Sequence, residues 1–252
     1  MADDRHVRLP GIGVIRTKEP TTKLAGLLDA GAGRVLSATV SQQAGRWYVS
    51  FTCEVTRPGH RPLPGPGVGV DVSVKSLAVL SSGEVIENPE HLSKYARRMA
   101  RLQGQCARRA APVKERASSG RWACSTTRLG RTHSKLAAAR SDRLHKLTAR
   151  LAKTHATVVI EDLGVAAMTA SARGSRQRRG KAGLKRAVLE AAPGELRRQL
   201  AYKTAWYGSA LVVADRWYLF QELSRCKPVK AKLSLSERTC RCEHWVWPQT
   251  GT

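Results

Sequence analysis

The sequence predicts an α/β fold in which a mixed sheet is flanked by helices and preceded by a small β domain. Three observations support this prediction. Short runs of alternating apolar residues fill the first 55 residues, a segment dense in Pro and Gly follows, and helical and strand patterns then alternate as far as residue 217. A block of strands followed by helix, strand, helix and strand is typical of layered α/β domains.

The N-terminal part reads as strands and turns. RVLSATVS and WYVSFTCEV flank a QQAGR turn, and apolar residues alternate at Val40, Trp47, Val49 and Phe51. This period of two predicts a half-buried antiparallel hairpin within a partial β-barrel. The following RPGHRPLPGPG cannot continue a helix or a strand ladder, so it predicts a linker and a domain boundary near Pro66.

The segment after the linker begins with strands and continues with basic helices. VGVDVSVKSLAVLSSGEVIENP predicts two or three antiparallel strands around an SSG turn. Between His91 and Arg109, a helical stripe is formed by Tyr95, Met99, Leu102 and Cys106. A second helix is expected from about Ser134 to Lys153, and the two helices are expected to form an antiparallel pair.

The next elements complete the predicted α/β layer. ATVVIEDL reads as a short strand buried on both faces and ending in two acids. SARGSRQRRGKAGLKR lacks an apolar period and predicts a mobile loop, followed by a helix from about Ala187 to Tyr207 and a strand in ALVVADRWY. The predicted domains are therefore residues 1–65, 66–225 and 226–252.

The charge of the chain points to a polyanionic partner. Forty-four Lys and Arg against 19 Asp and Glu give a net charge of +25 and a pI near 10.8, which concentrates nucleic acid around the protein. A ribosomal or membrane-surface protein stays possible on composition alone. No segment reaches the roughly 20 apolar residues of a membrane span, and the N-terminus is not signal-like. We expect a cytoplasmic protein with reduced thiols.

Two carboxylates stand out as candidate metal ligands. Asp71 lies within an apolar strand, where an unpaired carboxylate is costly. Glu161 ends another apolar strand, and neighbouring strands of one sheet can bring both acids to one cleft. Carboxylate oxygens suit Mg²⁺ or Mn²⁺. The alternative for either acid alone is a helix cap or a surface ion pair.

Several ordered segments resemble the TnpB proteins, the OrfB products of insertion sequences. GVDVSVKSLAVLSSGEVIENP resembles the first RuvC motif of that family, and VVIEDLGVAAM resembles the second. HLSKYARRMARLQGQCARR and GLKRAVLEAAPGELRRQLAYKTAWYGSALVVADRWY are similar to the family's helices and next strand, and the N-terminal segments to its wedge β-barrel. The resemblance covers about His6 to Trp217.

The resemblance implies an RNase H-like nuclease module of RuvC type. Asp71 matches the family's first catalytic Asp and Glu161 its catalytic Glu, both ligands of Mg²⁺. It also implies that guide RNA and DNA are the partners, held through backbone shape and charge. The phosphate contacts that we predict, with a solvated charged face as the alternative, are Arg97, Arg98, Arg101, Arg176, Arg178 and Arg179.

The C-terminal part departs from the family pattern. The family's zinc ribbon has two C-x-x-C pairs, and this chain has none there. Cys226, Cys240, Cys242 and His244 could in principle hold a metal, but the C-x-C-x-H spacing of the last three is unfavourable. We therefore expect free thiols and no Zn²⁺. Residues 226–252 are interpreted as a degenerate ribbon with an aberrant tail, for which we hypothesise frameshifts in a decaying transposon gene.

The family's third catalytic acid has no counterpart. Asp162 and Asp215 lie near the expected cleft but match no catalytic position. A two-metal site that lacks one ligand places its second ion and the attacking water poorly, so we expect impaired cleavage. A non-catalytic binder of RNA or DNA and a non-functional pseudogene product stay open as alternatives.

Overall fold

The computed structural model describes residues 3–56, 59–73, 75–109, 111, 117–170, 178–214, 239–242 and 245–250. Of these, residues 178–181, 239–242 and 245–250 are described by their backbone alone. Contacts divide the chain into two compact units. One comprises Met1–Gly59 and Arg98–Lys135, and the other His60–Arg97 and Leu136–Thr252. The division into domains 1–65, 66–225 and 226–252 stays a prediction.

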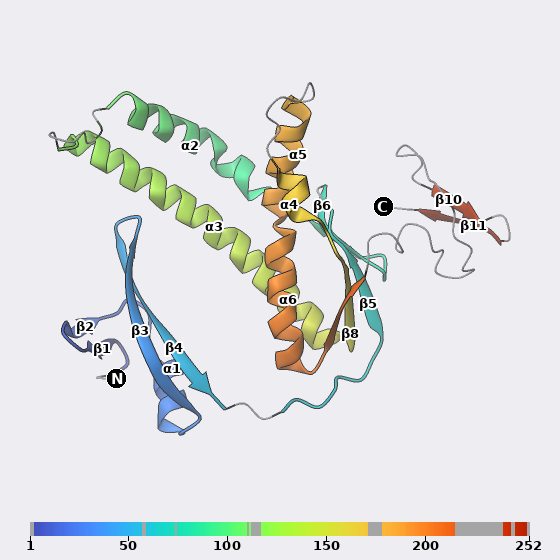
Figure 1. Cartoon of the computed structure of the whole chain (residues 1–252), viewed down its shortest axis with the longest axis horizontal. Helices are drawn as coiled ribbons and strands as arrows, with labels where there is room; N and C mark the ends of the chain where they lie inside the picture. The colour runs from blue at the N-terminus through green and yellow to red at the C-terminus, as the bar shows by residue number, and fades with distance from the viewer. Residues whose placement is uncertain are drawn as a thin grey trace. The chain divides into compact units, whose positions relative to one another are not determined.

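Besides helical residues 98–107 and 120–135, the first unit contains two antiparallel hairpins and a short helix (Figure 1). The strands pair as β1 (His6–Leu9) with β2 (Gly13–Arg16) and β3 (Gly33–Gln43) with β4 (Arg46–Val55). Helix α1 (Thr22–Asp29) was not predicted. The second hairpin is confirmed, and its turn places Ala44 and Gly45 at positive φ, as a type I′ turn requires. Within this unit the described strands form two separate two-stranded sheets, so the partial barrel is not confirmed.

The apolar face of the β3–β4 hairpin is less buried than its alternation suggests. Val49 and Phe51 are half-buried, as predicted. Trp47 and Val40 are 69% and 40% exposed. The period of two thus identified the strands and their shared face, but not how much of that face is covered.

A five-stranded mixed sheet organises the second unit. Its order is β7-β6-β5-β8-β9, with the antiparallel strands β5 (Gly67–Asp71), β6 (Ser76–Leu80) and β7 (Val85–Glu87) at one side. Strands β8 (Thr157–Glu161) and β9 (Ala210–Ala214) run parallel to β5. The predicted mixed sheet is confirmed. Strands β10 (Thr239–Cys242) and β11 (Trp245–Thr250) form a separate antiparallel pair.

The helices described in the rest of the chain agree only in part with the predictions. They are α2 (His91–Ala107), α3 (Gly120–Thr154), α4 (Val165–Thr169), α5 (Arg178–Ala191) and α6 (Pro193–Tyr207). The stripe of α2 is confirmed, because Leu102 is buried and Tyr95, Met99 and Cys106 are half-buried. None of the described helices combines the length and the apolar character that a membrane span needs.

Three helix predictions are wrong for identifiable reasons. Helix α3 begins well before Ser134. The apolar pattern missed its first half because that half buries small polar residues, such as Ser125 and Thr132, whose hydroxyls bond back to the carbonyl four residues earlier. The single helix expected over 187–207 is broken at Ala192, whose φ of 49° precedes Pro193. The expected loop ends early, because α5 starts at Arg178.

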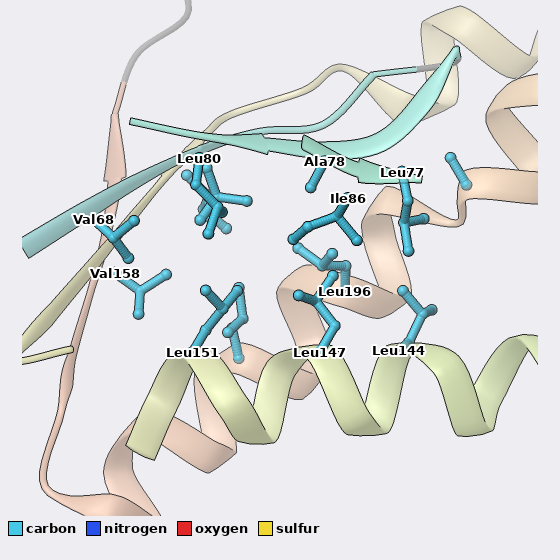
Figure 2. Packing of buried hydrophobic residues seen from close by; sticks show 14 residues of the cluster. Val68, Leu77, Ala78, Leu80, Ile86, Leu144, Leu147, Leu151, Val158 and Leu196 are labelled. Atoms are coloured by element: carbon cyan, nitrogen blue, oxygen red, sulfur yellow. The ribbon is translucent and has the colours of Figure 1, made fainter. Parts of the chain in front are cut away.

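One face of the sheet packs against helices and forms the core (Figure 2). Val68 and Val70 of β5 and Val158 and Ile160 of β8 share a buried cluster with leucines of α3 and α6, namely Leu144, Leu147, Leu151, Leu196 and Leu200. Burial alternates along both strands. The prediction that β8 is buried on both faces is therefore wrong: its other face is only half-buried.

Candidate functional site

Asp71 and Glu161 end the two central strands of the sheet. The parallel register pairs Val70 with Ile160, and each acid is the next residue of its strand. Neighbouring strands lie about 4.8 Å apart. Because successive side chains point to opposite faces, both carboxylates lie on the half-buried face, opposite Val70 and Ile160. The two predicted acids are thus brought together at the carboxyl edge of the sheet.

The donor set at this edge fits a hard divalent cation. Two carboxylates from adjacent parallel strands offer oxygen ligands, which suit Mg²⁺ or Mn²⁺. Both residues are half-buried. Their role as metal ligands stays a prediction. Within the described part of the chain, no group of three or more His, Cys, Asp or Glu side chains could hold a metal ion.

The acid that follows Glu161 has a different partner. Asp162 forms an ion pair with Arg197 of α6, and both side chains are about half exposed. The backbone N–H of Asp162 donates to the carbonyl of Ala214 at 2.9 Å, which extends the β8–β9 ladder by one residue. Asp215 lies outside the described residues. The described site therefore combines two acids, with Asp162 bound to a helix.

The predicted phosphate contacts fall into two groups. Arg97, Arg98 and Arg101 lie on α2 and are exposed, as a binding surface requires. Arg178 and Arg179 lie in the first turn of α5, where only the backbone is described, and Arg176 lies outside the described residues. Contact of these six arginines with nucleic acid stays a prediction.

The cysteines of the predicted ribbon remnant lie where the structure describes the backbone alone or nothing. Cys226 and His244 lie outside the described residues, and Cys240 and Cys242 lie in β10, where only the backbone is described. Cys53, Cys106 and Cys124 are free thiols.

Sequence reasoning missed Glu190 of α5, which anchors the start of α2. The side chain of Glu190 is 7% exposed, pairs with Arg140 of α3 and accepts a hydrogen bond from the backbone N–H of Leu92 at 2.9 Å. It thereby caps the first turn of α2 from another helix. The local sequence around Glu190 offers only a run of Glu, Ala, Ala and Pro that marks the end of a helix. The partners of Glu190 lie 50 and 98 residues away in the sequence and leave no local pattern.

The chain matches known proteins over most of its length. The OrfB_IS605 family model, described as "Probable transposase", matches residues 50–172. "Putative RNA-guided DNA endonuclease Rv2885c" of Mycobacterium tuberculosis is 41% identical over 228 residues, which is 86% of this chain and 46% of that protein. "Putative RNA-guided DNA endonuclease InsQ" of Escherichia coli K12 is 38% identical over 218 residues, covering 84% and 52%. The chain thus spans about half the length of these relatives.

A solved structure shares the fold. A chain in the cryo-EM structure of the Cas12f1-sgRNA-target DNA complex matches with a TM-score of 0.59 and 14% identity. The match covers 96% of this chain and 56% of that one. At this identity the likeness concerns the arrangement of helices and strands alone.

Proposed function

Because the chain belongs to the TnpB/OrfB family of insertion-sequence-encoded RuvC-like nucleases, we propose that it is a transposon-encoded nucleic-acid-binding protein derived from an RNA-guided, Mg²⁺-dependent DNA endonuclease. The observation that carries the proposal is the parallel register of β5 and β8, which supports a shared site for Asp71 and Glu161. The names of the relatives and the Cas12f1-like fold agree with a RuvC-type nuclease module.

The two acids are proposed to hold the ion. A bound Mg²⁺ supplies activation of water and stabilisation of the leaving oxygen in phosphodiester cleavage. Asp71 and Glu161 would bind it from adjacent strand ends, and the core under Val70 and Ile160 would keep the two carboxylates at a fixed spacing. Two protein ligands suffice to bind an ion that keeps several waters, as Mg²⁺ usually does.

The basic helices are proposed to hold the nucleic acids. A charge of +25 favours polyanions. Arg97, Arg98 and Arg101 would contact phosphates of guide RNA or DNA without reading sequence, because the guide supplies base pairing. Glu190 would act indirectly, since it anchors the first turn of the helix that carries these arginines.

A non-catalytic binder is the second candidate. It is favoured by the described site, where Asp162 is occupied by Arg197 and no group of three acids is found among the described residues. A two-ion site with two carboxylates holds its second ion poorly. Under this candidate the protein binds transposon RNA or DNA and competes with longer relatives, with cleavage lost or strongly reduced.

A plasmid cleavage assay separates the two candidates. The full chain is incubated with supercoiled DNA in the presence of Mg²⁺ or EDTA. The site variants Asp71→Asn and Glu161→Gln are tested alongside it. The control variant is Asp142→Asn, which changes an exposed acid paired with Lys146. Nicking that needs Mg²⁺, is lost in both site variants and persists in the control supports the nuclease. DNA binding with a steep salt dependence but no nicking supports the binder. DNA binding that is insensitive to salt contradicts both.

A further inference from the structure

The end of β8 presents two consecutive acids to opposite sides of the sheet. Glu161 shares the half-buried face with Asp71, whereas Asp162 follows it toward the face covered by α3 and α6. A slip of one residue at this strand end would exchange the two carboxylates, because it moves every side chain to the other face. The buried Val158 and Ile160 hold the register along β8, and a partner for Asp162 can hold it at the last residues of the strand.

Arg197 is the partner of Asp162 at this strand end. Its Nη1 binds Oδ1 of Asp162. Arginine suits the task because its guanidinium is planar and permanently charged. The carboxylate of Asp162 is thereby held on the helix side.

Helix α6 is a rigid support for Arg197. The neighbouring Leu196 is 1% exposed and Leu200 is fully buried in the core beneath the sheet. Gln199 is also fully buried and accepts a hydrogen bond from the hydroxyl of Thr148 on α3 at 3.0 Å. An arginine that projects from such a helix keeps its position when the strand end fluctuates.

We propose that Arg197 is a positioning residue that fixes which of the two consecutive carboxylates faces Asp71. This inference rests on the proposed metal site at Asp71 and Glu161. Arg197 acts only through Asp162, so it binds neither the ion nor the substrate. It links the folding of α6 onto α3 to the orientation of Glu161 on the far side of the sheet.

The sign of the effect on metal affinity tests the proposal. By charge alone, removal of a cation near the site tightens the binding of a divalent ion. Loss of positioning weakens it. For a half-exposed ion pair we expect Arg197→Ala to weaken Mn²⁺ binding about two- to fivefold, and Arg197→Lys to restore part of the loss.

The experiment measures Mn²⁺ binding to the full chain, without nucleic acid, by the loss of the free-ion signal in electron paramagnetic resonance. The matched control is Arg150→Ala, which removes another ion pair, with Glu84, whose side chains are both 47% exposed. Weaker binding in Arg197→Ala with unchanged binding in Arg150→Ala supports the proposal. Unchanged or tighter binding in Arg197→Ala overturns it.

A further variant separates this inference from the proposed function. If the wild type binds Mn²⁺ and Glu161→Gln abolishes binding, the metal site stands, and the result for Arg197→Ala judges the positioning role alone. If the wild type does not bind Mn²⁺, or Glu161→Gln binds it equally well, the proposed metal site is wrong and the inference falls with it. Thermal melting of each variant checks that the fold is retained.

Discussion

Replacement of Gly208 by alanine should destabilise the second unit more than an ordinary surface substitution does. Gly208 ends α6 with φ +77°, in the left-handed region. A Cβ there would come far inside 3.0 Å of the carbonyl oxygen of Arg61 and within 3.3 Å of the His60 Cβ. The same residue accepts a hydrogen bond from the backbone N–H of Leu63 at 2.8 Å. The substitution therefore disturbs the segment that leads into β5.

The expected cost follows from these contacts. Left-handed backbone with a Cβ costs about 1–2 kcal/mol. Displacement of Arg61 weakens the bond from Leu63, which is worth about 1 kcal/mol. The sum is about 2–3 kcal/mol, or roughly 5–10 °C in melting temperature for a chain of this size. Urea denaturation and thermal melting both measure it.

Two further glycine variants isolate the cause. Gly194→Ala, in the first turn of the same helix with open space around its Cβ, should be neutral or stabilising by about 0.5–1 kcal/mol. Gly208→Asn relieves the backbone strain but keeps the Cβ, so it should lose less than Gly208→Ala and still more than Gly194→Ala. A Gly208→Ala variant within about 0.5 kcal/mol of the wild type would refute the reasoning.

Four other predictions follow from single residues. Leu151→Ala should cost about 2–5 kcal/mol in urea denaturation, because Leu151 is fully buried in the core; a loss below about 1 kcal/mol contradicts the packing. The hydrogen bond from Arg198 lowers the pKa of Glu195 to about 2, so the contribution of Glu195 to stability should be complete above pH 4.5 and be lost as the pH drops toward 2. A Glu195→Gln variant with the same pH profile as the wild type would exclude this cause. Burial, followed by nearby cationic side chains, lowers the pKa of His91. Below pH 6.5 the unfolded chain takes up a proton at this residue and the folded chain does not, so stability should fall there. The variant His91→Gln should flatten that decline. Arg101→Ala should weaken DNA binding and reduce the slope of log affinity against log salt by about one, whereas an unchanged slope argues against a phosphate contact.

The sequence predicted the position of the candidate site because that position depends on local patterns. The apolar runs around Asp71 and before Glu161 predict buried strands that carry one acid each. In the structure both strands end at these acids, and the parallel register brings the two together. The side of the sheet follows from alternation alone. The chemical role of Asp71 and Glu161 does not follow from the same patterns, because spacing and strand register do not identify a bound ion.

Long-range side-chain partners could not be predicted in this way. Glu190 reaches Leu92 across 98 residues and Arg140 across 50. Such contacts depend on the rotation of each helix about its axis, which apolar periodicity fixes only to a broad stripe. The same limit explains the long α3, because buried hydroxyls such as those of Ser125 and Thr132 count as polar in any apolar pattern.

The break between α5 and α6 shows where local chemistry outweighs periodicity. The sequence prediction was one helix from about Ala187 to Tyr207, but Pro193 cannot donate the helical hydrogen bond and forces Ala192 out of helical geometry. Because of this break, α6 begins as a separate helix whose Leu196 and Leu200 pack independently of α5. Arg197 lies between those two leucines and forms its ion pair with Asp162 at the end of β8. The proline that separates α5 from α6 therefore helps to set the position of Arg197 beside the candidate metal site.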